Sequence, residues 1–345
     1  MSNVYYKKTN SKTTVQEIQQ ISKSLLTTLV EKEQISLNKT IPLKVHFGEK
    51  GNKTFVKSEN YLGIIDFLKE RKIESLFMET SVLYGGQRFK AEVHHKTALE
   101  HGFDQLPIIF ADGESGEDYA ETEVDLKHYD SCKIGKKFLD YNQLVVVSHF
   151  KGHQLAGFGG AIKQLAMGHA SKGGKLAMHM GNKPQIKNRK CEQCNLCQKR
   201  CNEAAITIGE KSFIDHDKCV GCGACVPACP HNAISFITLQ SMAKFLMGGN
   251  KFREKIVEYA YAAQLDKKNI YINFAMNITK GCDCEPRKMR PLIEDFGIMV
   301  STDPVALDKA CWDLAKEKGK KFKGAEQFDY AEKVGLGSQN YVLIK

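Results

Sequence analysis

The sequence predicts an α/β protein with a mostly parallel sheet and flanking helices, into which a small cysteine-rich domain is inserted. Short apolar runs without polar alternation are separated by stretches of helical spacing, a pattern typical of parallel strands covered on both faces. Eight of the twelve cysteines fall between residues 191 and 229. With 345 residues, 42% of them hydrophobic, the chain can bury one large core beside a small insert. We expect an α/β domain from residues 1–187 and 239–345 and an insert from residues 188–238.

The N-terminal part of the chain predicts a helix and no export signal. Residues 1–12 are polar and carry lysines, without the apolar core of a leader. Residues 14–37 place Ile18, Leu25 and Leu29 at near-helical spacing, as in an amphipathic helix. No run approaches about 18 apolar residues, so no membrane span is expected. These features indicate a protein of the reducing cytoplasm.

Six apolar runs are the expected strands of the sheet, at residues 43–47, 75–78, 106–111, 144–148, 270–277 and 297–301. Polar groups follow most of them, and ligands of open α/β sheets bind at the carboxyl ends of the strands. We therefore expect one edge of the sheet to gather Glu79-Thr80, Asp112-Gly113, Ser148-His149, residues 281–284 and residues 301–304. Asp303-Pro304 has a second interpretation, as the N-cap and first residue of a helix over residues 304–317.

The segment from His149 to Lys163 (HFKGHQLAGFGGAIK) is the densest group of reactive residues outside the cysteine runs. Its glycines would let the backbone approach a ligand, and the helix that follows would favour an anion at its start. It lacks the GK(S/T) ending of a Walker A loop and the glycine spacing of a dinucleotide-binding loop, so neither ATP nor NAD binding is indicated. Each histidine here, including His169, can also be a hydrogen-bonded structural residue. The candidate catalytic residues are His149, Lys151, His153 and Lys163, and the candidate cofactor-binding residues are Gly157, Gly159, Gly160 and His179.

The two cysteine runs repeat one pattern at an offset of 28 residues, Cys191-x2-Cys194-x2-Cys197-x3-Cys201 and Cys219-x2-Cys222-x2-Cys225-x3-Cys229-Pro230. In two-cluster ferredoxins three such cysteines hold one [4Fe-4S] cluster and the fourth ligates the other cluster. One cluster is expected on Cys191, Cys194, Cys197 and Cys229, and the other on Cys219, Cys222, Cys225 and Cys201. Zinc also binds paired CxxC motifs, but it does not need the third cysteine. Asn202 stands where the pattern prefers proline, so the potential of the second cluster is expected to differ.

Two further cysteines, Cys282 and Cys284, are separated by one residue just past an expected strand. In extended geometry both would face the same way and could hold a metal, form a third redox group or act as a thiol pair. Buried, inert thiols are the alternative. Cys132 and Cys311 carry no motif and are expected in the core.

The formal charge of +10 suggests an acidic partner. Basic residues gather around the first cysteine run, at Lys183, Lys187, Arg189, Lys190, Lys199 and Arg200. An acidic electron carrier such as ferredoxin or flavodoxin could dock there, although a solvated lysine-rich surface explains the same residues. Aromatic residues are not interleaved with this patch, so nucleic-acid binding is not indicated.

Several segments together resemble the uncharacterised iron-sulfur-centre proteins of domain of unknown function 362. They are "VVVSHFKGHQLAGFGGAIKQLAMG" at 145–168, the tandem cysteine motif, "NITKGCDCEP" at 277–286, "STDPVALDKA" at 301–310 and "YAEKVGLGSQNYVLIK" at 330–345. The resemblance implies an α/β domain with a ferredoxin insert and no particular substrate. Over about thirty residues, His153, Lys163 and His179 are also similar to the nickel-pincer lactate racemases, where the lysine anchors the cofactor and the later histidine ligates nickel. This local similarity implies a related site rather than the same cofactor.

We expect an iron-sulfur redox protein in which two [4Fe-4S] clusters, suited to anaerobic life, deliver low-potential electrons to an unknown small-molecule substrate or an additional metal. That site would lie at the carboxyl edge of the sheet, with histidines as proton donors. One alternative is a carrier that transfers electrons or clusters and catalyses nothing. Another is a non-redox isomerase whose clusters are structural.

Overall fold

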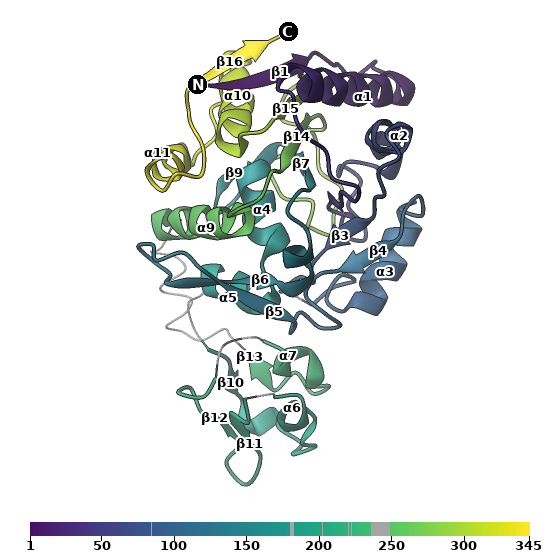
Figure 1. Cartoon of the computed structure of the whole chain (residues 1–345). Helices are drawn as coiled ribbons and strands as arrows, with labels where there is room; N and C mark the ends of the chain where they lie inside the picture. The colour runs from purple at the N-terminus through teal and green to yellow at the C-terminus, as the bar shows by residue number, and fades with distance from the viewer. Residues whose placement is uncertain (84, 180–182, 202, 220, 222, 236–248) are drawn as a thin grey trace.

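A computed structural model describes residues 1–83, 85–179, 183–201, 203–219, 221, 223–235 and 249–345 (Figure 1). Its centre is an eight-stranded sheet. In spatial order the strands are β16 (Tyr341–Ile344), β1 (Ser2–Lys7), β15 (Gly297–Ser301), β14 (Ile270–Ala275), β7 (Val145–His149), β2 (Leu43–Lys44), β3 (Phe77–Glu79) and β4 (Ile108–Phe110). All six expected strands are present, and the sequence analysis missed only the edge pair β1 and β16.

The sheet is mostly parallel, as expected, with one reversed strand. Neighbouring strands from β14 through β7, β2 and β3 to β4 all run parallel. β15 is antiparallel to both β14 and β1. Its carboxyl end therefore lies at the opposite edge, so the expectation that Asp303 joins the other polar groups is wrong. Asp303 instead caps α10 (Pro304–Glu317), accepting hydrogen bonds from the backbone N–H groups of Val305 (2.8 Å) and Ala306 (3.0 Å).

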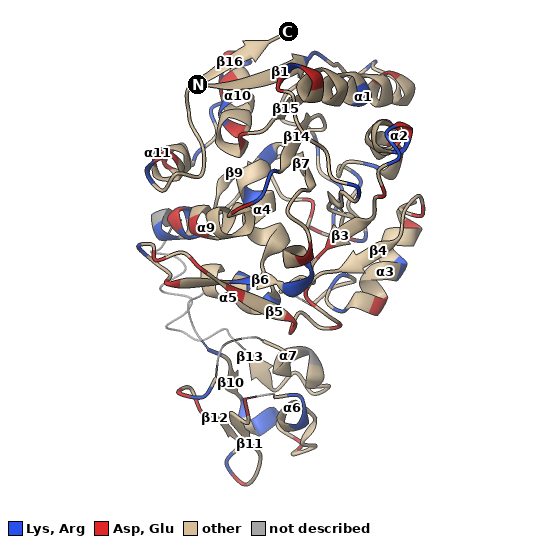
Figure 2. Cartoon of the chain, in the orientation of Figure 1, with Lys and Arg blue, Asp and Glu red and all other residues tan. Residues whose placement is uncertain are grey.

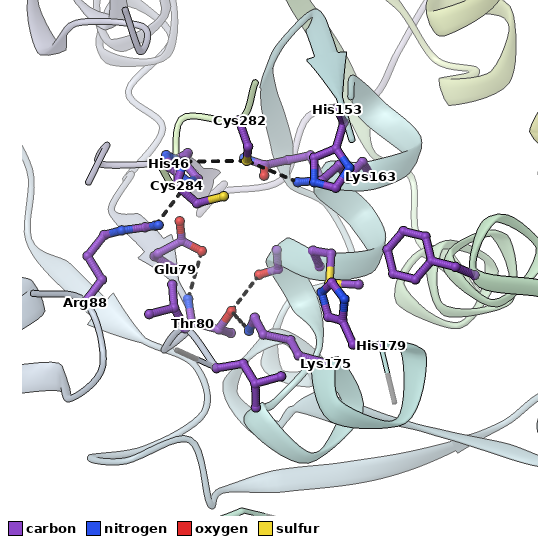
Figure 3. A pocket seen from close by; sticks show the side chains of 16 residues that line it. His46, Glu79, Thr80, Arg88, His153, Lys163, Lys175, His179, Cys282 and Cys284 are labelled. Carbon is purple, nitrogen blue, oxygen red and sulfur yellow. Dashed lines mark hydrogen bonds between the residues drawn. The ribbon is translucent and has the colours of Figure 1, made fainter. Parts of the chain in front are cut away.

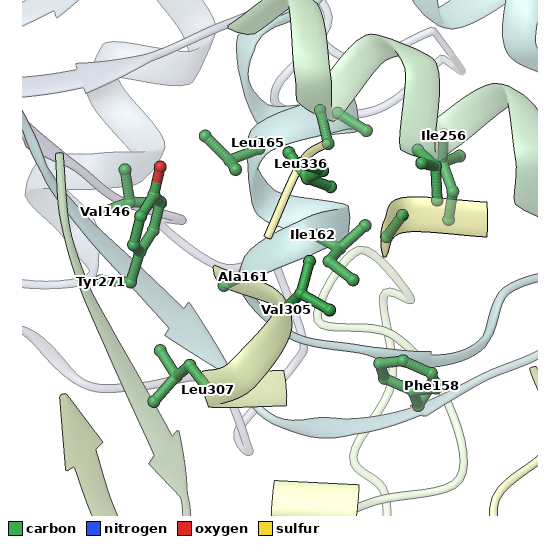
Figure 4. Packing of buried hydrophobic residues seen from close by; sticks show 14 of the residues in the cluster. Val146, Phe158, Ala161, Ile162, Leu165, Ile256, Tyr271, Val305, Leu307 and Leu336 are labelled. Atoms are coloured by element: carbon green, nitrogen blue, oxygen red, sulfur yellow. The ribbon is translucent and has the colours of Figure 1, made fainter. Parts of the chain in front are cut away.

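Helices cover both faces of the sheet (Figure 1). One face packs against α1 (Val15–Lys32), α2 (Leu62–Glu70) and α3 (Ala91–Glu100), and the other against α4 (Ala161–His169), α9 (Gly249–Gln264), α10 and α11 (Glu326–Lys333). Each face of the sheet has its own hydrophobic core, the first with α1–α3 and the second with α4 and α9–α11. Successive β7 residues alternate between them: Val145 and Val147 belong to the first core, and Val146 belongs to the second (Figure 4). This double burial explains why the strand is apolar without alternation. No helix in the described ranges is long and apolar enough to cross a membrane.

Shorter elements complete the α/β part. They are α5 (Lys172–His179), the hairpin strands β5 (Tyr119–Glu123) and β6 (Ser131–Gly135), the pair β8 (Lys151–His153) and β9 (Gly157–Gly159), and the 3-10 turns Ser58–Tyr61 and Lys136–Asp140. Helix α1 begins at a capping box in which the side chains of Thr14 and Glu17 each bind the other's backbone N–H. Cys132 and Cys311 lie fully buried in the second core, as predicted.

The cysteine-rich segment, residues 183–235, extends from the sheet domain on the side of β5 (Figure 1). It contains β10 (Gln185–Ile186), the 3-10 turn Asn188–Lys190, α6 (Leu196–Lys199), β11 (Ile206–Thr207), β12 (Phe213–Ile214), α7 (Cys225–Ala228) and β13 (Ile234–Ser235). Left-handed residues recur at the 28-residue offset, as Gln193 and Gly221, Asn195 and Gly223, and Ala204 and Asn232. The described parts of the two repeats therefore share these three left-handed positions, which the first repeat adopts without glycine.

Candidate functional site

A cavity of about 190 Å³ opens at the carboxyl edge of the sheet (Figure 3). Its walls come from the residues that follow β2, β3 and β14 and from helices α4, α5 and α9. Among the lining side chains are His46, His153, Lys163, His179, Cys282 and Cys284. The structure thus brings together residues up to 238 positions apart in sequence, including five of the predicted site residues outside the two cysteine runs.

Lys163 and Cys282 form the polar centre of the cavity. The Nζ of Lys163 lies 3.7 Å from the Sγ of Cys282, which also accepts hydrogen bonds from the Cys284 thiol and backbone N–H. The Cys284 hydrogen bond, with Lys163 and His153, holds the pKa of Cys282 well below its ordinary value despite burial. Burial opposes the charge of Lys163, but the neighbouring cysteines and Asp283 outweigh it and raise its pKa. Both shifts favour a thiolate on Cys282 beside a charged Lys163.

Two neutral histidines border this ion pair. The Nδ1 of His153 accepts a hydrogen bond from the backbone N–H of Ala156 at 3.0 Å, which leaves its Nε2 as the donor to Cys282. Burial lowers the pKa of His153 and lowers that of His179 to about 3. Phe252 stacks parallel to His153 and packs against His179, with ring centroids 6.5 and 4.9 Å apart. Both imidazoles are thus uncharged at neutral pH, and both ring nitrogens of His153 already have hydrogen-bond partners.

His149 and Lys151 lie behind the Cys282–Cys284 turn rather than in the main cavity. His149 Nδ1 is 3.0 Å from each carboxylate oxygen of Asp283, and Lys151 Nζ is 2.7 Å from one of them. The other ring nitrogen of His149 faces the carbonyl of Met276 at 2.7 Å. Burial would raise the pKa of Asp283, but His149 and Lys151 hold it far below its usual range. A second cavity of about 30 Å³ lies here and shares His46, Lys163, Gln164 and Cys282 with the first.

The glycines and the start of α4 differ from the expectation. The two first N–H groups of α4 are occupied by Asp308 of α10, at 2.7 and 2.9 Å, so no ligand anion is needed there. A Cβ on Gly160 would meet this carboxylate, and one on Gly157 would collide with the backbone of Lys323. Gly157 therefore serves packing, whereas Gly159 and Gly160 do line the smaller cavity. His169 is also structural, since its ring lies 4.1 Å from that of Phe138, away from the cavity.

Several buried charged residues of the site were missed. Arg88 lies 3.0 Å from His46 Nε2 and 3.2 Å from Glu49. Lys44, inside an apolar run, pairs with Glu79 at 2.7 Å. Lys44 and Glu79 are single polar residues at strand ends, and Arg88 and Glu49 lie in loops. Among them only Glu79 had been noted as a candidate.

The cysteine-rich segment holds two small cavities. One is lined by Cys191, Cys194, Cys197 and Cys229, and the other by Cys201, Cys219 and Cys225. Cys222, the expected fourth member of the second set, lies outside the described residues. Within the described ranges, no three His, Cys, Asp or Glu side chains lie close enough to hold a single metal ion.

The basic residues around the first run are mostly exposed (Figure 2). Lys187, Arg189, Lys190 and Lys199 are exposed to solvent. Arg200 is also exposed and pairs with Glu117, and Lys183 donates to the carbonyl of His216. Most of this patch is therefore free to meet a partner.

A family model described as domain of unknown function (DUF362) matches residues 41–313. The chain belongs to the DUF362 family. No curated protein matches this family member. Similar solved structures include a Thermotoga maritima protein, at 13% identity over 90% of this chain and 60% of that one, with a TM-score of 0.42. They also include the lactate racemase apoprotein of Thermoanaerobacterium thermosaccharolyticum, at 12% identity over 92% and 58%, with a TM-score of 0.44. This DUF362 chain thus spans about three fifths of the length of these structures.

Proposed function

We propose that the protein is an iron-sulfur redox enzyme that delivers low-potential electrons to a substrate in the cavity at the carboxyl edge of the sheet. The observation that carries this proposal is the interleaving of the two cysteine runs. One cavity combines three cysteines of the first run with the last of the second, and the other does the reverse as far as it is described. Crossed ligation is the pattern of two-cluster ferredoxins and is not needed for zinc.

The surroundings of the sulfur atoms fit such clusters. The last cysteine of each run accepts a backbone N–H four residues later, from Ala205 to Cys201 and from Ala233 to Cys229, both at 3.3 Å. Backbone N–H bonds to cluster sulfurs tune their potential. Apolar residues of both repeats, including Ile206 and Ile234, pack around the cysteines and limit water. When bound, the clusters would supply single low-potential electrons.

The cysteine-rich segment begins close to the main cavity. His179 lines that cavity, and Pro184 lines the cavity of Cys201, Cys219 and Cys225. Five Cα-to-Cα steps join His179 to Pro184, so these two Cα atoms are at most about 18 Å apart even when the chain is fully extended. Covalent connection therefore keeps this cysteine set near the proposed substrate.

The residues of the main cavity supply binding and protons. Lys163 and Arg88 present positive charge to an anionic group of the substrate. Burial lowers the pKa of Lys175 to about 8, so this lysine can release a proton near neutral pH. The exposed basic residues around α6 would receive an acidic ferredoxin or flavodoxin.

The test uses protein purified without oxygen. We expect about eight irons and eight sulfides per chain. The reduced protein is then mixed with a panel of small electron acceptors, and reoxidation is followed by absorbance for wild type, Lys163→Ala and the control Lys280→Ala, which removes an exposed lysine. At least one acceptor should reoxidise wild type and the control much faster than Lys163→Ala, with equal cluster content in all three. Equal rates with every acceptor would support the carrier alternative instead, and protein without iron would refute both.

A further inference from the structure

We propose that Cys282 is the nucleophile of a dithiol site that, together with Cys284, reduces the disulfide of a small carboxylated thiol. The thiol chemistry stands on the geometry of the main cavity alone. Only the return to the reduced state rests on the proposed function, because that step draws its electrons from the iron-sulfur clusters.

The two thiols face the same cavity and touch each other. Cys282 and Cys284 both line the main cavity, and Asp283 between them lines the smaller one, within a turn closed by the hydrogen bond from the backbone N–H of Glu285 to the carbonyl of Cys282 at 3.0 Å. The Cys284 thiol donates to the Cys282 sulfur. Two sulfurs in direct contact need little backbone movement to form a disulfide.

The turn that carries Cys282 and Cys284 is held in place by hydrogen bonds to its side chains and backbone. Asp283 is held by His149 and Lys151, and its carbonyl accepts the backbone N–H of Glu49 at 3.0 Å. The side chain of Glu285 accepts the backbone N–H of Cys282 at 3.0 Å. The nucleophile therefore sits on a preorganised support rather than on a freely moving loop.

Donors from several elements meet at the Cys282 sulfur. Lys163 of α4 and His153, the last residue of β8, donate to it, and the Cys284 thiol does so from its own turn. His46 after β2 and His179 of α5 are neutral at neutral pH. The carboxylate of Asp283 is held by its own contacts with Lys151 and His149. Positive charge and donors favour the thiolate, which is the reactive form of cysteine.

The cysteines outside this turn and the repeats lack such an environment. Cys132 and Cys311 are fully buried, and burial raises the pKa of both thiols. Among the described cysteines that are not proposed cluster ligands, Cys282 is thus the one whose surroundings favour nucleophilic attack.

The reaction balances without a further reagent. The Cys282 thiolate attacks one sulfur of R–S–S–R′, forming Cys282–S–S–R and releasing R′S⁻. Cys284 gives up its proton, which reaches one of the released thiolates, and attacks the Cys282 sulfur. This forms the Cys282–Cys284 disulfide and releases the second thiol. Two electrons, one from each cluster, and one proton then restore the thiolate and thiol.

The walls of the cavity indicate which disulfides fit. Val82, Leu83, Met167 and Phe252 are apolar lining residues of the cavity. Arg88 and Lys175 line it together with Lys163 (Figure 3). The charged groups suit a carboxylate on the thiol compound, and the apolar residues suit its carbon skeleton. A volume of about 190 Å³ admits one half of a small organic disulfide rather than a protein.

The first experiment treats the cluster-loaded protein, without oxygen, with 5,5′-dithiobis(2-nitrobenzoate), a small carboxylated disulfide. Wild type should release two thiolates per chain and keep no label. Cys284→Ser should release one and keep one label on Cys282, located by peptide mass spectrometry, and Cys282→Ser should release none at comparable speed. Cys132→Ala serves as the control and should match wild type. Equal release by wild type and Cys282→Ser, or stable labelling of wild type, would overturn the inference.

A second measurement tests the thiolate itself. The rate of Cys282 alkylation by iodoacetamide is followed against pH in Lys163→Met and in the control Lys280→Met, which removes an exposed lysine near the same turn. Loss of the adjacent ammonium should move the midpoint of the profile upward by about one to three pH units, whereas the control should leave it unchanged. An unmoved midpoint in Lys163→Met, or a stoichiometric metal other than iron that blocks alkylation, would overturn the assignment.

The last arm separates this inference from the proposed function. Oxidised wild type is incubated with reduced ferredoxin, and its reactive thiols are counted again. Return of two thiols supports both ideas. If Cys282 reacts as described but no thiols return, the dithiol site stands and electron delivery to the cavity is wrong.

Discussion

Replacing Asp283 with Asn removes one buried negative charge and little volume. In the wild type this carboxylate contacts Lys151 Nζ at 2.7 Å and His149 Nδ1 at 3.0 Å, with all three side chains at least 90% buried. Removing one partner of a buried ion pair typically costs about 3–5 kcal/mol, because the remaining charge stays desolvated and unpaired. We expect a loss of that size in Asp283→Asn.

The assay is urea unfolding followed by fluorescence of Trp312, the only tryptophan. This residue lies in α10, so its signal reports the sheet domain and not the cysteine-rich segment. Asp66→Asn removes an exposed carboxylate and should change the free energy of unfolding by less than about 0.5 kcal/mol. Asp283→Asn combined with Lys151→Met should lose less than the sum of the two single variants. A loss below about 1 kcal/mol in Asp283→Asn, or additive losses, would refute this reasoning.

The same contact predicts a pH dependence. The folded pKa of Asp283 is depressed below its unfolded value of about 3.9. Its stabilisation is therefore fully present above the unfolded pKa and is lost progressively as the pH falls toward the folded pKa. The stability difference between wild type and Asp283→Asn should shrink in acid, and a difference that grows there would contradict the assigned charge.

Four further predictions follow from other parts of the molecule. Asp308→Ala should lower the free energy of unfolding by about 1–3 kcal/mol, because it uncaps α4, and an unchanged urea midpoint would contradict the cap. Cys201→Ala should remove the electron paramagnetic resonance signal of the cluster on the second run and spare the other; loss of the other cluster alone would exclude crossed ligation. Reduction by ferredoxin should slow as salt rises, through the exposed basic residues between 183 and 200, and a salt-independent rate would argue against docking there. His179 should remain neutral down to about pH 4 in histidine NMR spectra, and titration near pH 6.5 would contradict its burial.

The sheet was largely predictable because its central strands are buried on both faces and so have continuous apolar sequences. Whether a strand runs parallel or antiparallel to its neighbours leaves no comparable pattern in its sequence. The run at 297–301 was correctly placed in the sheet, but its antiparallel pairing with β14 moved Asp303 to the far edge. The strands β1 and β16 were missed because β1 (SNVYYK) mixes polar residues with apolar ones and β16 (YVLI) is a short run of four residues.

The site was only partly predictable because its key contacts join distant positions. Cys282, Lys163 and His153 were each singled out from local motifs, but the 3.7 Å approach of Lys163 to Cys282 spans 119 residues. The capping of α4 by Asp308 spans 147 residues, so the glycines before α4 suggested a ligand anion that the protein itself supplies. His46 carried too little local signal, as a lone histidine after a two-residue strand.

The antiparallel pairing of β10 with β13 bears on how this chain could have been assembled. Gln185 and Ile186 lie opposite Ser235 and Ile234, so the entry and exit of the cysteine-rich segment are about 5 Å apart. The segment of roughly fifty residues thus begins and ends at one pair of adjacent strands, as a single surface hairpin does. The chain between β10 and β13 can therefore be replaced by a tight turn, or by a different electron-carrying domain, without moving any strand of the sheet. The same junction is therefore where natural relatives or engineers can exchange one electron source for another.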